Sequence, residues 1–233
     1  MVHGAFKRGH SPFSTHHSRA SALAVMARYP AVGEVKTRLA ETLGAERACA
    51  LYRAFLRDIE ARFAYGPRAF VWMFHPPERD FAALAAAGVR CVPQVGRDLG
   101  ERLLHCMRHL CADGFERLIV IGADVPHLRD AWLDEAEQQL DTADVVLGPS
   151  DDGGYYLVAM RTPHDIFTGI TMGTASVLAD TLAKARRTGL RVHLLPGCFD
   201  VDGADDVVRL RQLLDADAGL RLPHTADALR RQG

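Results

Sequence analysis

The sequence has no paired cysteines and no long apolar run, and these absences exclude two classes of protein. Its five cysteines form no Cys-x-x-Cys pair, which predicts reduced, mainly buried thiols in a cytoplasmic protein rather than a disulfide framework. No apolar stretch approaches the roughly 18 residues that a membrane-spanning helix needs. We therefore expect no membrane insertion.

The chain also has almost no net charge. Its 28 Lys and Arg residues nearly balance its 29 Asp and Glu residues, for a formal net charge of -1. No general attraction to nucleic acid is expected, so any phosphate binding has to come from a few placed side chains. The first 20 residues are rich in His, Ser, Gly and Arg, and we expect residues 1–20 to be a disordered leader before a single transferase domain at residues 21–233.

Apolar runs and one-faced amphipathic segments alternate along the chain, without an internal repeat. The runs predict strands at Leu23–Met26, Ala69–Phe74, Arg90–Pro93, Leu118–Ile121, Val145–Gly148, Tyr155–Ala159 and Val192–Leu195. The amphipathic segments predict helices at Ala45–Ala64, Leu99–Cys111 and Thr174–Gly189, the last with Thr174 as its cap. This alternation favours an α/β fold with a mainly parallel sheet covered on both faces. The short connection before Tyr155 is compatible with one antiparallel strand.

Asp124 closes the most apolar strand, where open α/β sheets bind their ligands. If the protein uses Mg²⁺ or Mn²⁺, Asp124 is expected to supply its first protein oxygen. Asp200 and Asp202 follow the last strand and project the same way if that segment is extended, so one of them would meet Asp124 across the metal. The alternative is that these carboxylates only cap helices, Asp124 near Arg129 and the others after residue 203.

The loop after the first strand predicts a phosphate site. Gly33 allows a close backbone approach, Lys36 offers a mobile point charge, and Arg38 offers a planar fork for phosphate oxygens. The spacing is not that of a Walker A loop. The alternative is a solvated basic loop, in which an exposed Lys36 would add little to stability.

Two further loops contain candidate binding residues. Gln94 can read a nucleobase edge through its amide, and Gly96 would let a flat ring approach, although Asp98 also suits a plain helix cap. A rigid turn before the sixth strand is expected to hold hydroxyls or amines of an acceptor, or to be only a hairpin turn. Its residues are Asp151, Asp152, Gly153 and Gly154.

Taken together, these segments resemble a family of small bacterial proteins with the GT-A-like, nucleotide-diphospho-sugar transferase fold. The family is usually described as glycosyltransferases associated with radical-SAM enzymes, and it is close to the molybdenum-cofactor and lactyl-phosphate nucleotidyltransferases. The matching segments are 28–39, 94–103, 122–157 and 199–202, in the same order. The chain departs from the family pattern at Ala123 and Val125, and at Met172-Gly173-Thr174 on the acceptor side.

The resemblance implies a single three-layer domain and a role for each matching residue. Catalysis would depend on Lys36, Arg38 and Asp124. The nucleotide would be bound by Arg28, Gly33, Lys36, Arg38, Gln94 and Gly96. The acceptor would lie along Asp151, Asp152, Gly153 and Gly154. The metal would be held by Asp124 with Asp202 or Asp200.

We therefore expect a cytoplasmic, metal-dependent transferase that uses a nucleotide-activated donor and a small-molecule acceptor. The main interpretation is a glycosyltransferase that consumes a nucleotide sugar. The alternative is a nucleotidyltransferase that joins a nucleoside triphosphate to a phosphorylated acceptor and releases pyrophosphate. A second alternative is a non-catalytic nucleotide- or partner-binding protein of the same fold.

Overall fold

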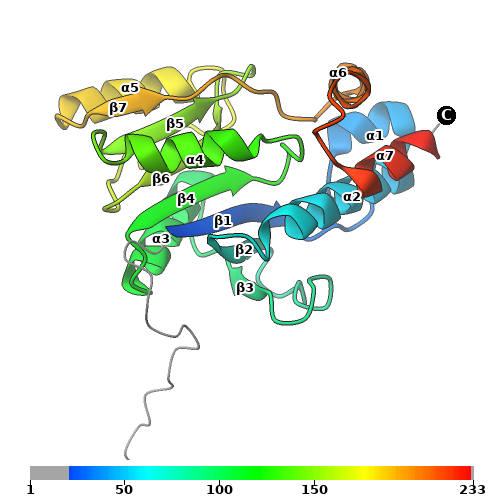
Figure 1. Cartoon of the computed structure of the whole chain (residues 1–233), viewed down its shortest axis with the longest axis horizontal. Helices are drawn as coiled ribbons and strands as arrows, with labels where there is room; N and C mark the ends of the chain where they lie inside the picture. The colour runs from blue at the N-terminus through cyan, green and yellow to red at the C-terminus, as the bar shows by residue number, and fades with distance from the viewer. Residues whose placement is uncertain (1–20, 232–233) are drawn as a thin grey trace, which may run out of the picture.

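The computed structural model describes residues 21–231, which form one seven-stranded sheet with helices on both faces (Figure 1). In chain order the strands are β1 (Ser21–Arg28), β2 (Ala69–His75), β3 (Arg90–Pro93), β4 (Arg117–Gly122), β5 (Val145–Pro149), β6 (Tyr155–Met160) and β7 (Val192–Leu194). All seven predicted strands are present, with ends that differ by two residues at most. The expected leader, residues 1–20, lies outside the described residues.

The sheet is mainly parallel, as predicted. Its strand order is β3-β2-β1-β4-β6-β5-β7. β1 pairs in parallel with β2 and β4, and β3 and β7 extend the parallel pairing at the two edges. β6 runs antiparallel to both β4 and β5, so its amino end lies at the same edge as the carboxyl ends of β1 and β4. This arrangement confirms the α/β fold class.

The described part of the chain has seven helices, listed here in chain order: α1 (Thr37–Leu43), α2 (Ala45–Phe63), α3 (Leu99–Ala112), α4 (Asp130–Gln139), α5 (Val177–Arg187), α6 (Ala204–Ala216) and α7 (Pro223–Arg230). The prediction that Thr174 caps α5 is wrong, because the cap residue is Ser176. The Thr174 hydroxyl instead donates to the carbonyl oxygen of Thr171 at 3.0 Å, inside the preceding turn.

The strands bury side chains on both faces, and this explains their nearly continuous apolar sequences. In β4, Ile119 and Ile121 join the core beneath α2 and α4, whereas Leu118 and Val120 join the core beneath α3 and α5. Each such residue contributes about 1.5–3 kcal/mol of burial energy. The two cores keep the central strands rigid, and the loops at their carboxyl ends are held on that rigid base.

The last helix, α7, folds back onto α2, and one buried carboxylate holds it there. Asp58 is fully buried within α2 and accepts hydrogen bonds from the backbone N–H groups of His224, at 3.0 Å, and Thr225, at 2.7 Å. It therefore caps the first turn of α7 from a distant part of the chain. Figure 1 shows α1, α2, α6 and α7 gathered at one end of the molecule.

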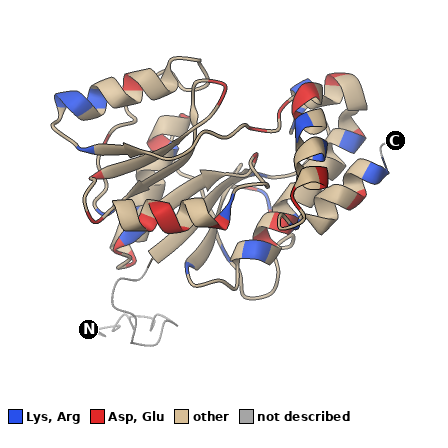
Figure 2. Cartoon of the chain, turned by 45° about the horizontal axis from the view of Figure 1, so that its top comes forward, with Lys and Arg blue, Asp and Glu red and all other residues tan. Residues whose placement is uncertain are grey.

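Charged side chains of both signs are interspersed over the helices (Figure 2). The last turn of α5 is basic, with Lys184, Arg186 and Arg187, whereas α4 has four acidic residues and no Lys or Arg. Between residues 21 and 231, no helix combines the length and the apolar character needed to cross a membrane.

Candidate active site

Two neighbouring cavities open at the carboxyl ends of β1 and β4. The larger has a volume of about 600 Å³ and also extends along the amino-terminal half of β6. The smaller, of about 280 Å³, lies against the loop that contains Lys36. They share a wall formed by Met26, Arg28, Asp124 and Asp202. The larger volume is typical of a small-molecule site, and its position is the ligand-binding edge of an α/β sheet.

Lys36 lies at this shared wall, between two carboxylates. Its Nζ atom is 2.5 Å from Asp124 and 2.7 Å from Asp202, and it also lies 5.8 and 5.9 Å from the ring centres of Tyr52 and Phe55. Only 4% of the Lys36 side chain is exposed, against 41% for each carboxylate. The expectation of a mobile, exposed charge is therefore wrong, because long-range ion pairs hold this ammonium in place.

The backbone of Lys36 is also unusual. Among residues 21–231 it is the one non-glycine residue with a positive φ, at 50°. This left-handed conformation costs a residue with a side chain about 1 kcal/mol, so the surrounding contacts have to maintain it. Burial alone would lower the pKa of Lys36, but Asp124 and Asp202 outweigh that effect and raise it. Lys36 is therefore a fixed cation at neutral pH.

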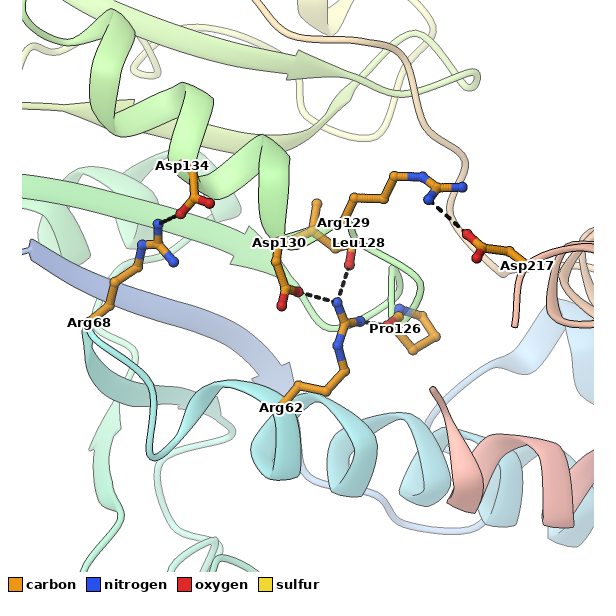
Figure 3. A network of polar contacts seen from close by, with 8 residues as sticks. All are labelled: Arg62, Arg68, Pro126, Leu128, Arg129, Asp130, Asp134 and Asp217. Carbon is orange, nitrogen blue, oxygen red and sulfur yellow. Dashed lines mark hydrogen bonds and ion pairs between the residues drawn. The ribbon is translucent and has the colours of Figure 1, made fainter. Parts of the chain in front are cut away.

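The loop that follows Asp124 is held in place by hydrogen bonds from Arg62 of α2, which serves as a clamp on it (Figure 3). The Arg62 guanidinium donates to the carbonyl oxygens of Pro126, at 2.7 Å, and Leu128, at 2.5 Å. Bonds from a charged donor to two carbonyl groups give the loop a single conformation. Because α4 begins after Arg129, Asp124 does not cap that helix. The position of Asp124 therefore depends on the end of β4 and on this clamp.

The segment after β7 brings the other two carboxylates to the same wall. The N–H of Val201 donates to the backbone oxygen of Asp124 at 2.9 Å, which places Asp200 and Asp202 on either side of this bond. Asp200 also accepts a hydrogen bond from the hydroxyl of Ser150. Burial, and then the neighbouring carboxylates, raise the pKa of Asp200 to about 6, although the Ser150 hydrogen bond opposes the rise.

The acidic residues fit a divalent cation that arrives with phosphate groups. Within residues 21–231, no three His, Cys, Asp or Glu side chains are already grouped as metal ligands. Asp124 and Asp202 nevertheless converge on one cation, the Lys36 ammonium. Mg²⁺ characteristically binds one or two carboxylates and takes its other ligands from phosphates and water. Asp202 suits the role of second metal ligand, beside Asp124, better than Asp200, whose carboxylate accepts a hydrogen bond from Ser150.

Gln94 lines the larger cavity, but half of its amide is already used. Its Nε2 group donates to the backbone oxygens of Met73, at 2.7 Å, and Ala27, at 3.3 Å. Because both neighbours are acceptors, the amide nitrogen has to face them. Only the carbonyl oxygen of Gln94 is left for a ligand, so this residue presents a hydrogen-bond acceptor.

Sequence reasoning missed His75 and did not assign a role to Arg102, although both line the cavity beside Gln94. His75 is the last residue of β2, one position beyond the predicted end of that strand. Burial lowers its pKa, and the charges of Arg102 and Arg28 lower it further, so the imidazole is neutral. The strand-end rule that identified Asp124 would have found His75 if the strand had been extended by one residue.

Two predicted nucleotide-binding glycines line neither cavity. Gly96 has a φ of 143°, and a Cβ atom there would lie 2.7 Å from the backbone nitrogen of Arg102, so the close approach is to α3. Gly33 has a φ of 80° in an exposed turn. Backbone conformation and helix packing account for both residues without a ligand. Asp98 caps α3 by accepting the N–H of Glu101 at 2.8 Å, as its alternative interpretation predicted.

The turn before β6 divides its residues between the cavity and the surface. Asp152 and Gly154 line the cavity, and Asp152 accepts the N–H of Gly154 at 2.9 Å. Asp151 lines neither cavity and pairs with Arg209 at 2.8 Å. Gly153, with a φ of 87°, packs so closely on the backbone of residue 175 that a side chain there would overlap it.

Comparison with known proteins identifies the family. Residues 59–174 match the model of a family described as an uncharacterized protein conserved in bacteria, DUF2064. A crystal structure from Desulfovibrio desulfuricans G20, described provisionally as a nucleotide-diphospho-sugar transferase, is 33% identical with a TM-score of 0.84. The alignment covers 92% of this chain and 98% of that one. The chain belongs to the DUF2064 family. It has the nucleotide-diphospho-sugar transferase fold.

Two curated relatives of this DUF2064 protein are named for an activity. The 2-phospho-L-lactate guanylyltransferase of Methanothermobacter thermautotrophicus is 27% identical over 177 residues, which cover 74% of this chain and 76% of the relative. The phosphoenolpyruvate guanylyltransferase of Chloroflexus aggregans is 26% identical over 150 residues, covering 64% and 73%. Both are transferases, in agreement with the predicted enzyme class, and both names describe nucleotidyl transfer.

A more distant structure agrees in fold alone. The molybdopterin-guanine dinucleotide biosynthesis protein A of Archaeoglobus fulgidus is 14% identical with a TM-score of 0.53, over 83% of this chain and 100% of that one. The predicted relationship to the lactyl-phosphate nucleotidyltransferases is therefore supported by sequence, and the likeness to the molybdenum-cofactor protein is one of fold. The association with radical-SAM enzymes stays a prediction.

Proposed function

We propose that this DUF2064 protein is a nucleotidyltransferase, which transfers a nucleoside monophosphate from a nucleoside triphosphate to a phosphorylated acceptor. The observation that carries the proposal is the buried Lys36 ammonium between Asp124 and Asp202, on the wall that two cavities share. Two adjoining cavities suit a reaction between two substrates. The names of both curated relatives support the same chemistry.

The cationic side chains would hold the phosphates. Arg28 borders both cavities, and Lys36 and Arg38 border the smaller one, so together they can surround a triphosphate. In the reaction, an oxygen of the acceptor phosphate bonds to the α-phosphorus. The bond from that phosphorus to the bridging oxygen of the β-phosphate breaks, and pyrophosphate leaves. Fixed cations stabilise the charge that develops on these oxygens, and little covalent chemistry is needed from the protein.

The acidic pair would hold the cofactor. Asp124 and Asp202 would be the protein ligands of Mg²⁺ or Mn²⁺, and the bound ion would neutralise negative charge on the phosphates. The same pair keeps Lys36 charged and correctly placed before the nucleotide arrives. Asp124 and Asp202 would therefore serve the phosphates in two ways, by positioning Lys36 and by holding the metal.

The donor is proposed to be GTP. Gln94 presents a carbonyl oxygen to the cavity, and this acceptor suits the N–H groups on the Watson–Crick edge of guanine. Arg102, beside it, suits the acceptors of the same base. The guanylyl specificity named for both curated relatives points to the same choice.

Glycosyl transfer, the main interpretation from the sequence, remains a second candidate. The provisional description of the Desulfovibrio structure favours it. A glycosyltransferase would consume a nucleotide sugar and release a nucleoside diphosphate, so the products distinguish the two reactions. A non-catalytic protein would bind nucleotide and release neither product.

The test is product analysis with the purified full-length chain. GTP or a nucleotide sugar is supplied with Mg²⁺ or Mn²⁺ and a panel of phosphorylated and hydroxylated acceptors. We expect pyrophosphate and a new phosphoanhydride in the phosphorus NMR spectrum, with GTP preferred over the other triphosphates. Asp124→Asn should abolish this reaction, and Asp205→Asn, at an exposed residue that lines neither cavity, should not. Nucleoside diphosphate formed only from a nucleotide sugar would overturn the proposal.

A further inference from the structure

Charges of opposite sign occupy different ends of the larger cavity. Arg28 of β1 and Arg102 of α3 form a basic end, with the neutral imidazole of His75 beside them at the end of β2. At the other end are Asp152, from the turn before β6, and Asp200. A ligand that fills the cavity therefore meets a basic end and an acidic end.

The acidic end of the cavity is a wall formed by two segments that pack against each other. Gly153 packs on the backbone of residue 175, and its carbonyl oxygen accepts the N–H of Leu178 at 2.8 Å. The turn at residues 150–154 and the segment at 172–178 therefore hold each other in place. Ser150 joins this wall to Asp200 through its hydroxyl.

The rest of the wall is mainly apolar, apart from Thr174, whose hydroxyl donates to the carbonyl oxygen of Thr171. Tyr155, Met172 and Val177 line the cavity beside Asp152. No Lys or Arg lines the cavity from residues 150–231, within the part of the chain that the structure describes. Arg209 is the cation attached to this turn, but it pairs with Asp151 outside the cavity and lies 4.0 Å from the ring centre of Phe199.

We propose that the acceptor of this enzyme has one anionic group, its reacting phosphate, on a neutral or amine-bearing remainder with a short apolar part. This inference rests on the proposed nucleotidyl transfer. The reacting phosphate would lie at the central wall with Arg28 and Lys36. The remainder would extend to Asp152, which can accept a hydrogen bond from a hydroxyl or amine, and to the apolar side chains around it.

This specificity differs from that named for the two curated relatives. Phospholactate and phosphoenolpyruvate each have a carboxylate next to the phosphate. In this chain that second anion would face Asp152 and Asp200, at the end of the cavity that no Lys or Arg from residues 150–231 lines. Like charges placed together inside a cavity disfavour binding, and such repulsion is a common means of rejecting the wrong ligand.

The experiment compares three small phosphates of similar size: propyl phosphate, phosphoethanolamine and 2-phosphoglycolate. Each is titrated by calorimetry into the full-length protein saturated with a non-hydrolysable GTP analogue and Mg²⁺. We expect propyl phosphate and phosphoethanolamine to bind at least about tenfold more tightly than 2-phosphoglycolate, a difference of about 1.4 kcal/mol. Equal affinities, tighter binding of 2-phosphoglycolate, or no binding of any at millimolar concentration would overturn the inference.

Two variants make the result specific to the wall. Asp152→Asn removes the charge but keeps an oxygen that can accept the N–H of Gly154, so the turn should stay folded. It should weaken phosphoethanolamine binding. The ratio of the Kd of 2-phosphoglycolate to the Kd of phosphoethanolamine should fall by about threefold or more, which is about 0.65 kcal/mol. Asp205→Asn makes the same charge change at an exposed residue that lines neither cavity, and it should change nothing. An equal effect of the two variants would contradict the assignment of Asp152.

The failure of this inference can be told from the failure of the proposed function. If the GTP analogue does not bind in the first titration, nucleotidyl transfer itself is wrong. If the analogue binds but the carboxylated phosphate is preferred, the function stands and only the acceptor class is wrong.

Discussion

Replacement of Lys36 by Met should destabilise the metal-free protein and make Mg²⁺ a stabilising ligand. Met keeps most of the apolar stem that lies near Tyr52 and Phe55, but it removes the ammonium between Asp124 and Asp202. The two carboxylates would then repel each other without a cation between them. A divalent ion can take the place of the missing charge.

The magnitude follows from burial. Removing one partner of a buried ion pair costs about 3–5 kcal/mol. Here the lysine is 4% exposed but each carboxylate is 41% exposed, so water can stabilise the unpaired anions. We therefore expect a smaller loss of about 1–3 kcal/mol in the free energy of unfolding.

The assay is urea unfolding at neutral pH, with EDTA or with Mg²⁺, for the wild type and the variant. Mg²⁺ should restore more stability to Lys36→Met than it adds to the wild type. Lys184→Met is the control. The Lys184 ammonium pairs with one carboxylate, Asp165 at 3.3 Å, and donates to the backbone oxygen of Thr168 at 2.7 Å, so its loss should cost about 1 kcal/mol in either buffer. Equal losses for the two variants, or no extra effect of Mg²⁺ on Lys36→Met, would refute the role given to Lys36.

Three further predictions concern the residues around the site. Arg62→Ala should lower the free energy of unfolding by about 2–3 kcal/mol in urea titrations and weaken Mg²⁺-dependent nucleotide binding, because the loop after Asp124 loses its clamp; unchanged binding would show that the clamp is dispensable. Burial lowers the pKa of His127 from 6.5 to about 4, because the folded state favours the neutral imidazole. The free energy of unfolding is therefore highest above pH 6.5, and it falls by up to about 3 kcal/mol as the pH is lowered toward 4. His127→Phe should flatten that part of the stability profile, and an unaltered acid limb would contradict this cause. Gly153→Ala should destabilise by at least about 1 kcal/mol in thermal unfolding, since the positive φ and the backbone of Ala175 leave no room for a methyl group.

The sheet could be predicted from sequence because each strand is an apolar run buried on both faces. Helices α2 and α3 were predicted for a related reason, since each has one long apolar stripe. Helices α1 and α7 were missed. α1 has seven residues, and the left-handed Lys36 at its cap makes no side-chain capping bond. The start of α7 is capped by Asp58, from a remote part of the chain.

The sequence predicts the separate loops of the candidate site, but not the contacts between their side chains. Asp124, Asp202 and Lys36 each follow a strand, and the topology of an α/β sheet brings such loops together. Sequence reasoning could not show that Lys36 lies between the two carboxylates, because the contact with Asp202 spans 166 positions. It also assigned Gly96 to a ligand, whereas in the structure this residue lines neither cavity and packs against α3.

The most direct test of nucleotidyl transfer is a thermal unfolding titration of the wild-type protein with GTP, GDP and GDP- or UDP-sugars, each with and without Mg²⁺. A ligand at 100 times its Kd adds about 2.7 kcal/mol to the free energy of unfolding, which is readily measured. We predict that GTP with Mg²⁺ stabilises the protein most, and that Asp124→Asn removes the dependence on Mg²⁺. Stabilisation by a nucleotide sugar but not by GTP, or metal dependence retained in Asp124→Asn, would contradict the site described above.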